Sequence, residues 1–84
     1  MSNNDNTMQF DFSKNKKELT KEILGEVYTS LMTKGYNPVN QMVGYLISGD
    51  PSYITNFNGA RAMVGKLERN EILEEVLKVY LDIK

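Results

Sequence analysis

The side chains that most often perform acid–base, nucleophilic or metal chemistry are scarce in this sequence. Its 84 residues include no Cys and no His, which excludes thiolate nucleophiles, disulfides, thiolate or imidazole metal sites and histidine catalysis. Asp50 precedes a proline, as a helix cap does, and the glutamates of residues 68–75 lie among Lys and Arg as on a solvated helix face. We expect no enzymatic activity, no cofactor and no metal ion. An enzyme would need a polar pocket around Asp50 or the tyrosines.

A possible phosphate-binding loop lies between Gly59 and Lys66. The two glycines, Gly59 and Gly65, are one residue further apart than in that motif, and Leu67 replaces its metal-binding Ser or Thr. No strand is expected before it. We therefore interpret these glycines as residues of turns or of close helix contacts.

Nucleic-acid binding is the second functional hypothesis. Short helices joined by a tight turn, at residues 38–48 and 60–67, could form a helix-turn-helix-like module. For contacts with DNA they offer only Arg61 and Lys66 on one helix and Asn40 and Gln41 on the other. The net charge of −1, from 10 Lys and Arg against 11 Asp and Glu, also disfavours DNA and anionic membranes. We expect no nucleic acid as a partner.

The first 17 residues form a segment of different composition. Residues 1–17 contain no Leu, Ile or Val, so they cannot bury enough apolar surface to order themselves, and we expect a flexible N-terminal tail. Within it Met8, Phe10 and Phe12 alternate with polar residues, which would place them on one face of an extended segment. We expect these three side chains to dock on the folded body. A short edge strand or a strap would explain the same pattern.

Residues 18–84 form a single helical domain. Paired apolar residues from Leu19 onwards indicate a first helix that ends at Gly35. The Asn37-Pro38 step begins a second helix that closes at Gly49, and Asp50-Pro51 begins a short helical turn. A short helix over residues 60–67, containing Gly65, and a last helix capped by Asn70 complete the prediction. The fold class is all-α, a small bundle of four principal helices plus a short helical turn.

The first and last helices have apolar stripes wider than one neighbour would cover in so small a domain. A homodimer would cover them, and we predict a dimer seam on the last helix at Leu73, Leu77 and Tyr80. A monomer whose stripes are covered by the tail is the alternative.

The stretch of residues 34–54 is dense in Tyr, Gly, Asx-Pro and amide side chains. Such a composition indicates either an interaction surface, with tyrosine rings and hydrogen-bonding rims, or caps and turns whose tyrosines complete the core. The residues predicted for the interaction surface are Tyr36, Asn37, Asn40, Gln41, Tyr45, Asp50 and Tyr53.

Three segments resemble the IreB family of small regulatory phosphoproteins from Gram-positive bacteria: TMQF at residues 7–10, GYNPVNQMVGYLISGDPSYI at 35–54 and KLERNEILEEV at 66–76. The resemblance implies a cytoplasmic, non-enzymatic, helical homodimer. It also implies that the protein is phosphorylated by a membrane Ser/Thr kinase with wall-sensing repeats and dephosphorylated by a phosphatase. Through a downstream protein, it would modulate the cell-wall stress response. The implied phosphoacceptor is Thr7. Family members can have a second threonine where this chain has Asn4, and Thr55-Asn56 and Gly65 also depart from the family pattern.

The residues themselves agree with phosphorylation at Thr7, because a kinase needs its acceptor in an extended, accessible segment. Phosphate would add about −1.5 to −2 charges, next to Asp5 and Asp11. That charge would weaken docking of the tail unless a basic site receives it. No apolar run is long enough to span a bilayer, so we expect no membrane insertion and a cytoplasmic location.

Overall fold

The computed structural model describes residues 15–83, and within that range it is entirely helical with connecting turns. The all-α prediction with four principal helices is confirmed for this part of the chain. Two 3-10 turns are present where the sequence predicts one. The elements are α1 (Lys16–Thr33), α2 (Pro38–Ser48), η1 (Pro51–Tyr53), η2 (Phe57–Gly59), α3 (Ala60–Val64) and α4 (Arg69–Leu81).

Helix α1 is the scaffold of the domain. The side-chain oxygen of Asn15 accepts a hydrogen bond from the backbone N–H of Glu18 at 2.9 Å, so α1 begins at Lys16. Lys16 and Lys17, which the sequence analysis placed in the tail, are therefore helical. The buried face repeats every third or fourth residue, as an α-helix packed on one side requires.

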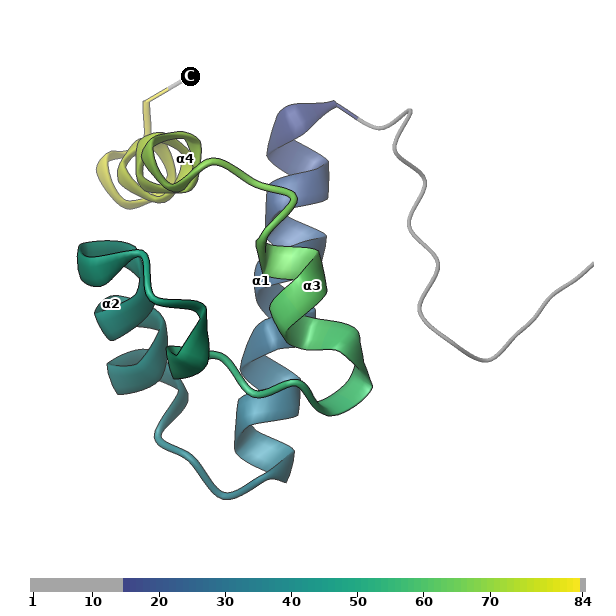
Figure 1. The fold of residues 1–84 in the computed structure, drawn as a ribbon. Helices are drawn as coiled ribbons and strands as arrows, with labels where there is room; N and C mark the ends of the chain where they lie inside the picture. Colours follow the sequence, from purple (N-terminus) through teal and green to yellow (C-terminus); the bar gives the residue numbers. More distant parts are fainter. Residues whose placement is uncertain (1–14, 84) are drawn as a thin grey trace, which may run out of the picture.

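The other helices pack around α1. Figure 1 shows α1 upright, with α2 beside it, α3 against it and α4 nearly end-on close to its first turns. The shared core contains three α1 residues and at least one from each of the other helices. Its members are Ile23, Val27, Leu31, Tyr45, Ile54, Ala60, Met63, Val64 and Ile72.

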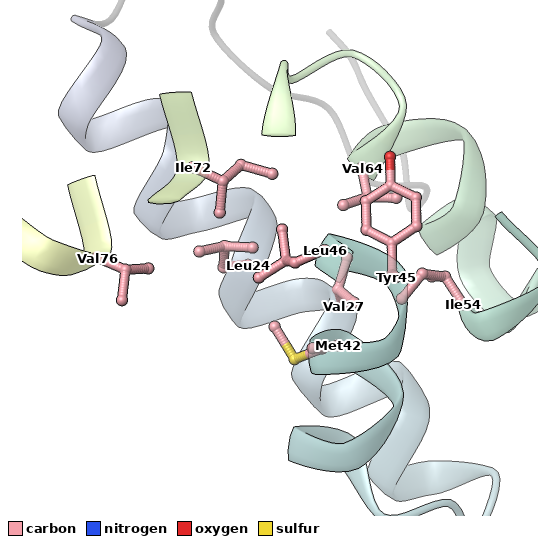
Figure 2. A pocket seen from close by; sticks show the side chains of 9 residues that line it. All are labelled: Leu24, Val27, Met42, Tyr45, Leu46, Ile54, Val64, Ile72 and Val76. Carbon is pink, nitrogen blue, oxygen red and sulfur yellow. The ribbon is translucent and has the colours of Figure 1, made fainter. Parts of the chain in front are cut away.

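The packing of α4 is looser than that of the other helices. A hollow of about 70 Å³ lies where α1, α2, α3 and α4 meet. Figure 2 shows the side chains around it, which are apolar apart from the Tyr45 hydroxyl group. Within α4 only Ile72 is buried. The position of α4 therefore depends on one fully buried side chain.

Two predicted helix boundaries are wrong. The short helix predicted over residues 60–67 ends at Val64, because the N–H groups of Lys66 and Leu67 bond to carbonyls three residues back and tighten the chain into turns. Gly65 therefore lies after the helix. Asn70 does not cap the last helix, because α4 already begins at Arg69.

Candidate functional site

The four residues predicted in the tail lie outside the described range of residues 15–83. They are the phosphoacceptor Thr7 and the docking residues Met8, Phe10 and Phe12. Their roles stay predictions. The other predicted residues can be placed, and they fall into the central segment and α4.

In the central segment, Asn37 and Asp50 each cap a helical element. The Asn37 side chain accepts a hydrogen bond from the N–H of Asn40 at 3.1 Å, and the Asp50 carboxylate accepts one from the N–H of Ser52 at 2.9 Å. The backbone N–H and then the hydroxyl of Ser52 stabilise the ionised form, so they hold the pKa of the Asp50 carboxyl below its usual range. These two acidic and amide side chains therefore organise the backbone locally.

A second set of contacts closes η1 onto α2. The side-chain amide of Gln41 donates to the carbonyl oxygen of Tyr53 at 3.0 Å. The Tyr53 ring lies where a Cβ atom on Gly44 would be, with ring atoms Cδ1 and Cζ at 2.6 and 2.9 Å from that position. Gly44 thus permits the close approach of the ring to α2.

The three tyrosines of the segment have different surroundings. Tyr45 is 8 % exposed and belongs to the core, Tyr53 rests on α2, and Tyr36 is about half exposed. Asn40 is exposed as well. The structure thus gives most of this segment a structural role, and binding of a partner by its surface stays a prediction.

Two arginines near the short helices bond to backbone carbonyls. Arg61 Nε donates to Ile54 O at 2.9 Å, and Arg69 Nη1 donates to Leu46 O at 3.1 Å. Helix α3, which carries Arg61, has only five residues. A recognition helix presents such side chains to bases and phosphates, so this geometry does not favour the helix-turn-helix hypothesis.

The predicted seam residues on α4 are exposed in the single chain. Leu73, Leu77 and Tyr80 expose 43 %, 55 % and 85 % of their side-chain surfaces. Because an α-helix turns by about 100° per residue, Leu73, Leu77 and Leu81 share one side of α4, and Val76 and Val79 share the other side. Tyr80 lies between the two sides. Helix α4 therefore presents two apolar surfaces.

The Val76 and Val79 side of α4 lines a groove that the sequence analysis missed. The α1/α4 groove has a volume of about 560 Å³, and Thr20 in its wall is 2 % exposed. Thr20 Oγ1 has no hydrogen-bond partner among the described residues. The signal in the sequence that could have revealed this groove is Thr20, a polar residue within the apolar stripe of α1. The lining residues are Lys17, Thr20, Lys21, Leu24, Glu75, Val76, Val79 and Tyr80.

An ion pair joins α1 and α4 near the groove. Lys16 Nζ lies 2.7 Å from Glu71 Oε2. The hydrogen bond to Glu71, and then its negative charge, raise the pKa of the Lys16 amine. The pair is exposed, so its effect on stability is small, but it identifies the first turns of the two helices as neighbours.

The comparison with known families decides what kind of protein carries this arrangement. A model of the IreB regulatory phosphoprotein family matches residues 5–82. The chain belongs to the IreB family. The matched range includes Thr7, the central segment and α4, so the resemblance seen in the sequence is confirmed. Membership of a regulatory phosphoprotein family is consistent with a protein that is not an enzyme.

Membrane-spanning helices and metal-binding clusters were the two other features sought among the described residues. Residues 15–83 contain no helix with both the length and the apolar character needed to cross a bilayer. The same range holds no cluster of three or more acidic, His or Cys side chains arranged to bind a metal ion.

Proposed function

We propose that this member of the IreB family is a cytoplasmic, non-enzymatic regulator whose Thr7 is phosphorylated by a membrane Ser/Thr kinase with wall-sensing repeats. A phosphatase would reverse the modification, and the phosphorylated and free forms would act differently on a downstream protein of the cell-wall stress response. The observation that carries the proposal is the family match over residues 5–82, which includes Thr7.

Two threonines of α1 are poor alternatives to Thr7 as the acceptor. Thr20 is buried, and Thr33 Oγ1 donates to the carbonyl of Thr29 at 2.8 Å within α1. A kinase binds its acceptor as an extended segment, so hydroxyl groups held in a helix are poor acceptors. Exposed Tyr36 and Asn40, on the central segment, are the proposed contact points for the downstream protein.

We expect Thr7→Ala to abolish most of the phosphate incorporated when the full chain is incubated with ATP and the catalytic domain of such a kinase. Phosphopeptide mass spectrometry locates the phosphate. Thr33→Ala is the control and should leave the incorporation unchanged. Full incorporation into Thr7→Ala would show that the acceptor is another residue. Extracts probed with Thr7→Ala and Thr7→Glu would then identify the protein that binds one form alone.

We also propose that the chain forms a homodimer through the side of α4 that carries Leu73, Leu77 and Tyr80. Its support is the large apolar surface of these residues, exposed on a helix with a single buried residue. Soluble monomers rarely leave such contiguous apolar surface in water. Glu71, Glu75 and Lys78 lie on the opposite side of the helix.

Leu77→Glu should raise the dissociation constant of the dimer about a hundredfold or more, because a carboxylate would be buried in an apolar interface without a partner. Sedimentation equilibrium measures this constant. Lys78→Gln changes the net charge by the same amount on the polar side of α4, where Lys78 is half exposed, and should leave the constant unchanged. An unchanged dissociation constant for Leu77→Glu would show that the dimer interface does not include this side of α4.

A further inference from the structure

The α1/α4 groove is a built binding surface that the described residues leave open. Its floor is apolar, with Leu24 on α1 facing Val76 and Val79 on α4. Its rim carries Lys17 and Lys21 on the α1 side. An apolar floor with a cationic rim suits a segment that has apolar side chains on one face and a carboxylate on the other.

Thr20 adds a polar requirement to this surface. Its Oγ1 atom is buried in the wall, and no described residue pairs with it. A buried hydroxyl group without a hydrogen bond costs free energy.

The groove and the proposed dimer seam are adjacent and share only Tyr80 among the described residues. Val76 and Val79 lie on one side of Tyr80, whereas Leu77 and Leu81 lie on the other side. A second chain bound at Leu73 and Leu77 would therefore leave the Val76 and Val79 side of the groove accessible to another occupant.

We propose that this occupant is the chain's own N-terminal segment, with Met8, Phe10 and Phe12 on the apolar floor. Asn15, where the described chain begins, is two residues from Lys17 on the groove's rim. Two residues, Ser13 and Lys14, separate Phe12 from Asn15, and the three Cα-to-Cα steps can span about 10 Å. The extended segment of residues 8–12 is about 13 Å long, which is similar to the rise of about 10 Å from Lys17 to Leu24 along α1.

The charges of the two partners are complementary. Asp11 lies between the two phenylalanines and would point away from the floor, toward the level of Lys17 and Lys21. Glu75 is the acidic residue of the opposite wall. Docking places Thr7 beside the body of the protein, next to the groove's far end.

Docking would also control phosphorylation, and this consequence alone rests on the proposed function. A kinase needs the tail extended in its own cleft, so only undocked chains are modified. A tail docked in about 90 % of molecules would be phosphorylated about tenfold more slowly than a free tail.

A spin label on Gln9 tests docking without any kinase. The sequence has no Cys, so Gln9→Cys gives one labelling site, on the face opposite Met8 and Phe10. In the unphosphorylated full chain we expect strong broadening of amide signals from residues 76–80 of α4. Amides in the first turns of α1 are close to the label along the chain, so they broaden with or without docking. Amides of residues 52–59, at the other end of α1 (Figure 1), should keep their intensity.

The control is a matched pair of tail variants on the same labelled chain. Phe10→Ala with Phe12→Ala should abolish the broadening of residues 76–80, whereas Ser13→Ala should preserve it. Broadening confined to the first turns of α1 in the unaltered tail would overturn the proposal. So would groove signals that shift with protein concentration but not with the label, because a second copy would then fill the groove.

The kinase assay distinguishes failure of tail docking from failure of the proposed phosphorylation of Thr7. If docking holds and the kinase modifies Thr7, the Phe10 and Phe12 double variant should be phosphorylated about tenfold faster. An intact docking signal with no phosphorylation of Thr7 would reject the proposed function and leave the groove assignment standing.

Discussion

Ile72→Ala should lower the free energy of unfolding by about 2–5 kcal/mol. Ile72 is fully buried, and it is the single buried residue of α4. Its truncation would enlarge the hollow beside it, which already has a volume of about 70 Å³, and would remove the main contact that holds α4 on the domain. A loss of this size is a large part of the stability of a small domain.

The matched control is its neighbour Leu73, which is 43 % exposed. Leu73→Ala should cost less than about 1 kcal/mol in the monomer. Urea unfolding followed by circular dichroism, at several protein concentrations, separates the stability of the fold from that of the dimer. Equal losses for the two variants at low concentration would mean that α4 is not held by Ile72.

Gly44→Ala should destabilise the protein by about 1–3 kcal/mol, although alanine is normally the better residue inside a helix. The new Cβ atom would lie within the space of the Tyr53 ring. The ring would have to leave α2, and with it the geometry in which Gln41 binds the Tyr53 carbonyl would change.

Gly25→Ala, in α1, is the control because nothing lies within 4 Å of its Cβ position. It should stabilise the protein by about 0.5–1 kcal/mol. A double-mutant cycle with Tyr53→Ala isolates the clash: once the ring is removed, Gly44→Ala should no longer destabilise. A cost that persists without the ring would assign the effect to α2 itself.

The helix starts at Pro38 and Pro51 could be predicted because their causes are local. The first N–H groups of a helix need acceptors, and the side chains of Asn37 and Asp50, each immediately before its proline, supply them. The helix ends at Gly35 and Gly49 were predictable too, because glycine adopts positive φ at the end of a helix more easily than other residues. Both residues have positive φ in the structure.

The start of α4 could not be predicted in this way. Asn70 has the side chain of a good cap, but the cap position falls on Glu68, whose side chain makes no capping bond. Arg69, the first residue of α4, donates instead to Leu46 O on α2. A contact between residues far apart in the sequence therefore sets this boundary, and local propensity had no information about it.

For the candidate surfaces, too, one part could be predicted from the sequence and another part could not. Helical periodicity indicated that α4 has more apolar surface than one neighbour covers, because the period follows from the order of side chains alone. Composition also marked the central segment as unusual. It could not say that Gly44 and Gln41 hold Tyr53, since that depends on how α2 and η1 meet.

The sequence by itself determined the helical class, the caps at Asn37 and Asp50, the family and the absence of Cys and His chemistry. Each of these follows from residue identity or from contacts within a few positions. Only the tertiary structure decided which apolar residues are buried, where α4 separates from α1, and that Thr20 is left in a groove wall without a described partner. The reason is that burial depends on the angle at which whole helices cross, and in this domain that angle rests on few long-range contacts.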